Sequence, residues 1–230
     1  MRRAPDDSEI LAARLRRRLN SLPLSFWVYK KAIDLFFALL LLPGLLFCML
    51  ILLVLNPLRN PGPMFFRQTR VGLNGEHFTI LKFRTVENPG TEMQLSPTQK
   101  SRLNRLGAFM RDTRVDEVPQ ILNVLKGEMS MIGPRPEQVT LYLQYSAVKP
   151  RFALRQMVKP GITGLAQLKH GYTDTVTGAA RKLNWDLLYL KRMGFGMETF
   201  LVWWTFRFVM AGLGKVFWRK LTEPFRMRSY

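Results

Sequence analysis

One long uncharged apolar segment, residues 35–55, constrains the fold of this chain more than any other feature. A helix needs about 20 apolar residues to cross the hydrocarbon of a bilayer, and this segment meets that length. The sequence therefore predicts a membrane anchor. A plain single-span helix is the simplest form that such an anchor can take.

A proline at the centre of this segment and basic residues on both flanks favour a different form. Pro43-Gly44 lies at mid-length, where proline removes a helical hydrogen bond and bends the axis. Basic residues tend to stay on the cytoplasmic side of a membrane. They stand on both sides of the segment, at Lys30, Lys31, Arg59, Arg67 and Arg70. We therefore predict a re-entrant anchor over residues 30–58, with both ends on the cytoplasmic side.

The charge balance indicates an anionic partner. Lys and Arg number 35 against 16 Asp and Glu, which gives a formal net charge of +19. Nucleic acid, anionic lipid and a phosphorylated substrate all fit such an excess. A single cysteine, Cys48, excludes an intrachain disulfide framework, and only His77 and His170 can supply imidazole ligands. Any metal is therefore expected to be a hard ion held by oxygens and phosphates.

The remaining pattern predicts a mainly α-helical fold with short β segments. Two extended segments, residues 64–70 and 77–83, flank the turn residues 72–75. Helices are expected at residues 8–19, 102–110, 118–126, 137–146 and 179–192. Residues 86–98 are predicted to form a mobile loop, and residues 158–167 an irregular or extended stretch.

Both ends of the chain mix basic with apolar residues. Residues 8–19 fit either contact with anionic headgroups or a solvated tail. Residues 198–220 combine aromatics such as Trp203 and Phe208 with cations such as Arg207 and Lys215. That mixture suits the headgroup zone of a membrane, and a buried core helix is the alternative.

Asp116 and Glu117 form an adjacent carboxylate pair at the start of a predicted helix. Helix capping explains the pair, because aspartate is a favoured N-cap, acidic residues complement the helix dipole, and Pro119 is tolerated in a first turn. A catalytic role is compatible with capping, because a helix N-terminus also stabilises an incoming phosphate. An aspartate there can attack phosphorus while the next carboxylate holds a metal ion.

Four basic residues are candidates for binding phosphate: Lys82, Arg84, Arg111 and Arg135. Lone basic residues usually belong to solvated faces. Arg135 differs, because Pro134 and Pro136 restrict the backbone around it and present its guanidinium for bidentate phosphate binding. The two-residue spacing of Lys82 and Arg84 places them on one side of an extended segment.

Four motifs follow one another along the chain: Lys82-Phe83-Arg84-Thr85, Asp116-Glu117-Val118-Pro119-Gln120, Gly133-Pro134-Arg135-Pro136 and Pro160-Gly161-Ile162-Thr163-Gly164. With their flanking segments, from about residue 30 to residue 206, they resemble the bacterial sugar transferase family, the monotopic phosphoglycosyl transferases. The resemblance implies transfer of a sugar 1-phosphate from a nucleotide-sugar, usually a uridine diphosphate sugar, to undecaprenyl phosphate. Such a transfer initiates the synthesis of exopolysaccharide, O-antigen or another glycoconjugate.

The resemblance also implies roles for individual residues. The family's aspartate–glutamate pair falls on Asp116, which would be the nucleophile, and Glu117, which would help to bind Mg²⁺. Its basic residues fall on Lys82, Arg111 and Arg135. The expected units are a basic tail (1–29), the re-entrant anchor (30–58), a catalytic domain on the cytoplasmic face of the bacterial inner membrane (59–197) and a membrane-surface segment (198–230).

Two stretches depart from the family pattern and leave the donor sugar open. Residues 168–174 lack the common asparagine- and arginine-containing pattern, and the usual serine near residues 194–196 is absent. The expected partners are undecaprenyl phosphate, a nucleotide-sugar and membrane lipids, and the oligomeric state, including a homo-oligomer, stays open. The alternative functions are a non-catalytic membrane assembly protein of the same fold and a membrane-attached nucleic-acid binder. Net charge alone supports the latter, so no nucleic acid is expected as a partner.

Overall fold

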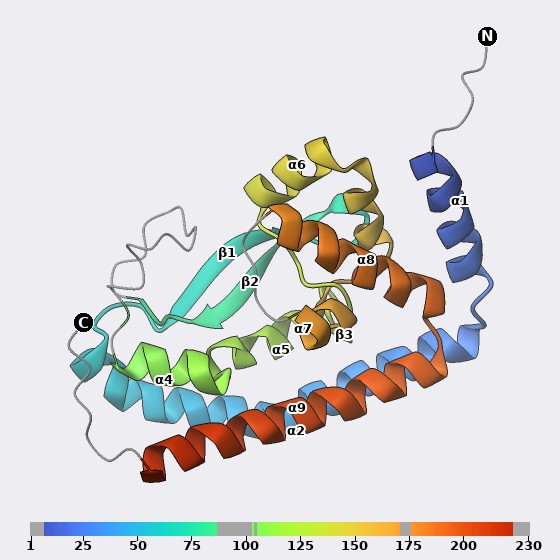
Figure 1. Cartoon of the computed structure of the whole chain (residues 1–230). Helices are drawn as coiled ribbons and strands as arrows, with labels where there is room; N and C mark the ends of the chain where they lie inside the picture. Colours follow the sequence, from blue (N-terminus) through green and yellow to red (C-terminus); the bar gives the residue numbers. More distant parts are fainter. Residues whose placement is uncertain (1–6, 87–102, 104, 171–175, 223–230) are drawn as a thin grey trace.

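The computed structural model of the chain describes residues 7–86, 103, 105–170 and 176–222 (Figure 1). In these residues the fold is mainly helical with short strands, which confirms the prediction of a mainly α-helical fold with short β segments. Two long helices, α2 (Leu24–Arg59) and α9 (Phe195–Thr222), run along one side of the molecule, and the smaller elements gather above them. Residues 87–98 of the predicted mobile loop lie outside the described residues.

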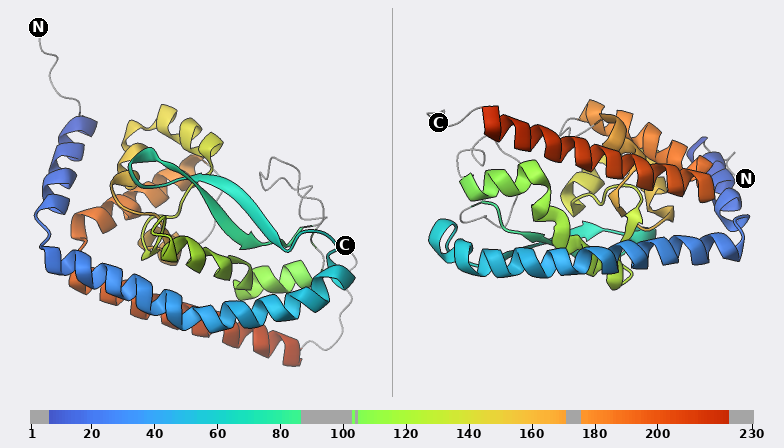
Figure 2. Two further views of the ribbon diagram at one scale, coloured as in Figure 1. Left: turned by 180° about the vertical axis from the view of Figure 1, so that it is seen from behind. Right: turned by 90° about the horizontal axis from the view of Figure 1, so that it is seen from below.

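The apolar segment forms the middle of α2, which is one continuous helix although Pro43 and Pro57 lie inside it. Its axis curves along its length (Figure 2). The helix therefore continues through Pro43 without a break, since a proline removes only one hydrogen bond of the helix interior. Among the described residues, α2 is the one helix that is long and apolar enough to cross a membrane by length and composition.

One face of α2 packs against the rest of the protein. Ala38, Leu45 and Leu52 recur every seven residues on this face and are buried in a cluster with Ile80 and Ile121. The opposite face exposes large apolar side chains, including Phe36, Leu40, Phe47, Leu50, Leu53 and Val54. A contiguous exposed apolar face of this kind marks a surface for lipid or protein.

Polar side chains tie both ends of α2 to the same body. At the N-terminal end, Lys30 Nζ lies 2.7 Å from Glu198 Oε2, and Asp34 Oδ1 accepts a hydrogen bond from Ser130 Oγ at 2.9 Å. At the C-terminal end, Asn56 Nδ2 donates to the Gly62 carbonyl at 2.8 Å, and Asn60 Nδ2 donates to the Arg84 carbonyl at 2.9 Å. Both ends of α2 are therefore held against the body of the protein, which leaves the apolar face between them exposed.

An antiparallel hairpin follows α2. Strand β1 (Phe65–Val71) pairs with β2 (His77–Phe83) around the short 3₁₀ turn η1 (Leu73–Gly75). The turn uses positive φ at Asn74 (53°) and Gly75 (85°), two residue types that tolerate the left-handed region. The predicted extended segments and turn are confirmed.

The carboxylate pair lies between two short helical pieces. Helix α4 (Arg105–Thr113) leads into the 3₁₀ turn η2 (Val115–Gln120), and α5 (Ile121–Leu125) follows. The single helix predicted for residues 118–126 is therefore wrong in its first turn, because Pro119 disfavours α geometry at the residue before it. Gly127, at φ 81°, ends the segment as predicted.

The second half of the chain surrounds a two-stranded parallel sheet of β3 (Ser130–Ile132) and β4 (Gly161–Thr163). Helix α6 (Val139–Val148), the 3₁₀ segment η3 (Pro150–Met157) and helix α8 (Val176–Arg192) pack over it. Helix α7 (Leu165–His170) corrects the prediction that residues 158–167 are wholly irregular or extended. Its six residues are too few for a helical period to stand out beside the turn residues Pro160-Gly161.

The two terminal segments both pack onto this body in part. Helix α1 (Asp7–Asn20) buries Leu15 and Leu19 in the cluster around α8, so the interpretation of these residues as a solvated tail is wrong. Helix α9 buries Glu198 and Leu201, but Trp203 and Phe206 are 52% and 65% exposed. These exposed aromatic side chains contradict the alternative interpretation of this segment as a buried core helix.

Candidate active site

A cavity of about 250 Å³ lies between the β1–β2 hairpin, η2 and the turn that follows β3. All six site residues predicted from the sequence line it: Lys82, Arg84, Arg111, Asp116, Glu117 and Arg135. Residues up to 53 positions apart in the sequence thus converge on one cavity, and all six side chains carry charges of a kind that phosphate chemistry uses.

Glu117 stands at the centre of the charged groups. Its Oε1 accepts hydrogen bonds from Lys82 Nζ at 2.7 Å and from Arg135 Nη2 at 2.8 Å. Arg114 Nη1 lies 4.0 Å from its other oxygen, Oε2. Burial opposes ionisation of Glu117, but Arg135 and Lys82 outweigh it and hold the pKa of this carboxyl well below its usual range. Glu117 is therefore a fixed anion that organises two cations.

Asp116 has the opposite environment. Its side chain is buried, and no group in the described part of the chain donates a hydrogen bond to its Oδ1. Burial, and then the neighbouring charge of Glu117, raise the pKa of Asp116 to about 6. A buried polar atom without a partner and a perturbed pKa beside a cavity are typical of functional sites.

Helix capping does not account for this position of Asp116. The residue at the N-cap of η2 is Arg114, and η2 has no side-chain hydrogen bond at its start. Arg114 adopts the left-handed region, with φ 61°, which is uncommon for a residue other than glycine. This conformation turns the chain between α4 and η2 and carries Asp116 and Glu117 to the cavity wall.

The other two predicted basic residues, Arg84 and Arg111, are held by groups other than Glu117. The Arg84 guanidinium donates to the carbonyls of Pro63 at 2.7 Å, Val86 at 3.3 Å and Asn60. It therefore fastens the exit of β2 to the end of α2. Arg111 Nε donates to Thr85 Oγ1 at 2.9 Å, which sets its guanidinium against the cavity.

Arg135 is held on its turn by an unusually close backbone contact. Gly161 N donates to the Pro134 carbonyl at 2.9 Å, and a Cβ on Gly161 would lie 2.1 Å from Gly133 N. A Cβ on Gly164 would lie 2.2 Å from the Gly133 carbonyl oxygen. Side chains are thus excluded at both positions, which explains the two glycines of the Gly161-Ile162-Thr163-Gly164 motif.

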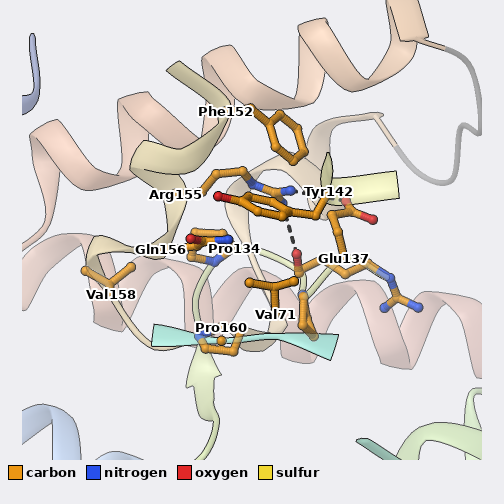
Figure 3. A pocket seen from close by; sticks show the side chains of 12 residues that line it. Val71, Pro134, Glu137, Tyr142, Phe152, Arg155, Gln156, Val158 and Pro160 are labelled. Carbon is orange, nitrogen blue, oxygen red and sulfur yellow. Dashed lines mark hydrogen bonds and ion pairs between the residues drawn. The ribbon is translucent and has the colours of Figure 1, made fainter. Parts of the chain in front are cut away.

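Arg155, a residue that the sequence did not single out, supports the same turn from behind (Figure 3). Its Nη2 donates to the Arg135 carbonyl at 2.9 Å, and its Nη1 donates to Glu137 Oε1 at 3.2 Å. Asp186 Oδ2 lies 2.8 Å from Nη2, and the Phe152 ring centroid lies 4.6 Å from the guanidinium carbon. One buried cation therefore links η3, α8 and the start of α6 to the Arg135 turn.

Removing this cation should cost much stability. Arg155→Met leaves the carboxylates of Glu137 and Asp186 without their partner in a buried place, which costs about 3–5 kcal/mol. The midpoint of thermal unfolding should therefore fall clearly. Arg151→Met is the matched control in the same segment, because its pair with Asp7 is exposed on both sides and is worth at most about 1 kcal/mol. Equal losses in the two variants would contradict a supporting role for Arg155.

Comparison with known proteins places the chain in a family. The model of the bacterial sugar transferase family matches residues 25–212. The chain belongs to the bacterial sugar transferase family.

Curated relatives agree with that assignment. Over 189 residues the chain is 38% identical to a UDP-N-acetylgalactosamine-undecaprenyl-phosphate N-acetylgalactosaminephosphotransferase of Aeromonas hydrophila, covering 80% of this chain and 44% of the relative. Over 180 residues it is 37% identical to a UDP-glucose:undecaprenyl-phosphate glucose-1-phosphate transferase of Xanthomonas campestris pv. campestris. That match covers 76% of this chain and 37% of the relative. It is 35% identical over 186 residues to the exopolysaccharide production protein PSS of Rhizobium leguminosarum bv. phaseoli. That match covers 77% of this chain and 93% of the relative. The chain thus spans less than half of the first two relatives and nearly all of the third.

Proposed function

We propose that this protein transfers a sugar 1-phosphate from a nucleotide-sugar, most simply a UDP-sugar, to undecaprenyl phosphate. The observation that carries the proposal is the pair of carboxylates in unlike environments, with Asp116 buried beside a cavity and Glu117 fixed by two cations. The names of the relatives from Aeromonas hydrophila and Xanthomonas campestris supply the substrate class. Release of UMP from a panel of UDP-sugars in the presence of undecaprenyl phosphate tests it, and no release with any of them would refute it.

In the proposed first step, an Asp116 oxygen attacks the phosphorus that bears the sugar. A bond forms between that oxygen and phosphorus, and the bond from phosphorus to the leaving UMP breaks. In the second step, a phosphate oxygen of undecaprenyl phosphate attacks the same phosphorus and displaces Asp116. The product is a lipid diphosphate sugar, and the aspartate is regenerated.

The cations around the cavity would stabilise the charge that develops in both steps. Lys82 and Arg135 are already oriented by Glu117, so they need little reorganisation when a phosphate arrives. Arg111 and Arg114 line the same cavity from the α4 side. Arg84, whose guanidinium is occupied by three backbone carbonyls, would hold the wall in place rather than contact substrate.

The carboxylate pair fits a magnesium ion as cofactor. Among the described residues no group of three or more His, Cys, Asp or Glu side chains forms a metal cluster, so an all-protein cage is not available there. Mg²⁺ usually binds one or two carboxylates together with substrate phosphates. The partnerless Asp116 Oδ1 and the Oε2 of Glu117 meet that requirement. A bound ion would neutralise phosphate charge, and Glu117 would hold it.

The proposed location is the inner membrane of a bacterial cell, with the catalytic part on the cytoplasmic face. The apolar face of α2 would enter the lipid, while Lys30, Asp34, Asn56 and Asn60 hold both of its ends to the catalytic body. This attachment of both ends supports a re-entrant or in-plane anchor rather than a straight span. The cavity would then face the leaflet that contains the lipid phosphate.

Cysteine labelling in intact cells tests this topology. Ser8→Cys before α2 and Glu76→Cys after it, each in a Cys48→Ala background, should both resist a membrane-impermeant maleimide until the cells are permeabilised. The reason is that both positions lie on the cytoplasmic side if the anchor does not cross the membrane. Labelling of Ser8→Cys alone in intact cells would establish a spanning helix.

A further inference from the structure

A second row of side chains faces the cavity from strand β1. Phe66, Gln68 and Arg70 line the cavity, whereas Arg67 and Thr69 between them are exposed, as expected for the alternation of a strand. Phe66 pairs with Lys82 across the hairpin, so the row starts beside the lysine that binds Glu117. Gln68 follows about 7 Å further along the strand.

Arg70 fixes the orientation of the Gln68 amide. Arg70 Nη2 donates to Gln68 Oε1 at 2.6 Å, and Arg70 Nη1 donates to the Pro136 carbonyl at 3.2 Å. This end of β1 is also tied to the chain after Arg135 by the hydrogen bond from Val71 N to the Glu137 carbonyl, at 3.1 Å. With its oxygen engaged, Gln68 keeps its NH₂ group as a donor that no acceptor among the described residues occupies.

The chemistry of this donor differs from that of its neighbours. Lysine and arginine around the cavity suit the charged oxygens of phosphates, whereas a neutral amide N–H suits a neutral oxygen such as a carbonyl or a hydroxyl. A nucleotide-sugar carries neutral oxygens on its base, its ribose and its sugar. A polyprenyl phosphate has none, because everything beyond its phosphate is hydrocarbon.

We propose that Gln68 recognises the nucleotide-sugar donor, through a hydrogen bond from its amide nitrogen to a neutral oxygen of the nucleoside or of the sugar. Arg70 is the positioning residue that holds the amide in this orientation. The inference rests on the proposed function, because it needs two substrates of unlike chemistry in one cavity. It adds a residue that distinguishes the two substrates.

Steady-state kinetics of the full-length protein test the inference. Gln68→Met keeps the length of the side chain but removes the hydrogen bond, so the KM for the UDP-sugar should rise about three- to tenfold. The KM for undecaprenyl phosphate should stay unchanged. Thr69→Val, on the exposed side of the same strand, is the matched control and should match the wild type. A rise in the KM for the lipid, or no change in either KM, would overturn the inference, whereas an inactive wild type would instead refute the proposed function.

Calorimetric binding of UMP, UDP and a UDP-sugar, measured in an Asp116→Asn background that cannot react with the donor, separates the two sources of the neutral oxygen. If the nucleoside supplies it, Gln68→Met weakens all three ligands by a similar factor. If the sugar supplies it, only the UDP-sugar is weakened. Arg70→Lys should raise the donor KM in the same way, and the double variant should add little to either single change, because the two residues act as one unit. Fully additive effects would contradict positioning by Arg70.

Discussion

Replacing Asp116 by asparagine is expected to lower turnover by at least about 10⁴-fold while the protein still folds. The amide has nearly the same shape as the carboxylate but cannot form the bond to phosphorus. Asp116 is buried, and no donor in the described residues satisfies its Oδ1. Because a neutral group is less costly to bury than an anion, the midpoint of thermal unfolding should stay the same or rise.

Asp112→Asn is the control for this change. Asp112 precedes the pair by four residues and is exposed on α4, so the same chemical change there should leave turnover close to that of the wild type. Both variants are compared by UMP release and by thermal unfolding in the same detergent. Near-normal turnover in Asp116→Asn would remove this residue from the reaction.

Replacing Glu117 by glutamine should have the second-largest effect, at least about a hundredfold loss in kcat. One oxygen of Glu117 accepts hydrogen bonds from Lys82 and Arg135, at 2.7 and 2.8 Å. A neutral amide can accept such a bond, but it leaves two neighbouring cations without their counter-ion. We expect the two cations to move apart, which would disrupt the arrangement that receives the phosphate.

Magnesium titration distinguishes the two roles given to Glu117. If it also holds the ion, the Mg²⁺ concentration for half-maximal activity should rise in Glu117→Gln, and kcat should fall. Glu76→Gln, at the exposed turn of the hairpin, is the control and should change neither quantity. A lower kcat with unchanged Mg²⁺ dependence would leave Glu117 as an organiser of cations only.

Local sequence patterns predicted a large part of the fold and of the site. The two extended segments were predicted on either side of a turn with two glycines, and the apolar anchor from its uninterrupted apolar length, because each signal lies within one segment. The site residues Lys82, Arg111, Asp116, Glu117 and Arg135 do line one cavity. Their individual roles stay predictions.

The parts that the sequence did not predict depend on contacts between distant segments. Arg155 supports Arg135 only because η3 folds behind the turn and α8 brings Asp186 to it. Arg84 and Lys82 looked equivalent on one strand face, but the end of α2 supplies the carbonyls that occupy Arg84. A single sequence carries no signal for such pairings, since neither partner is unusual within its own segment.

Asp116 is proposed to form a covalent bond to the sugar phosphate, and the most direct test of this bond omits the lipid acceptor. Purified protein mixed with a UDP-sugar alone should release a burst of UMP equal in amount to the protein. Mass spectrometry should then find one phosphosugar on the peptide that contains Asp116. Addition of undecaprenyl phosphate should discharge it, and Asp116→Asn should show neither burst nor adduct. UMP that appears only after the lipid is added, with no adduct at any time, would contradict the account and indicate direct transfer between the two substrates.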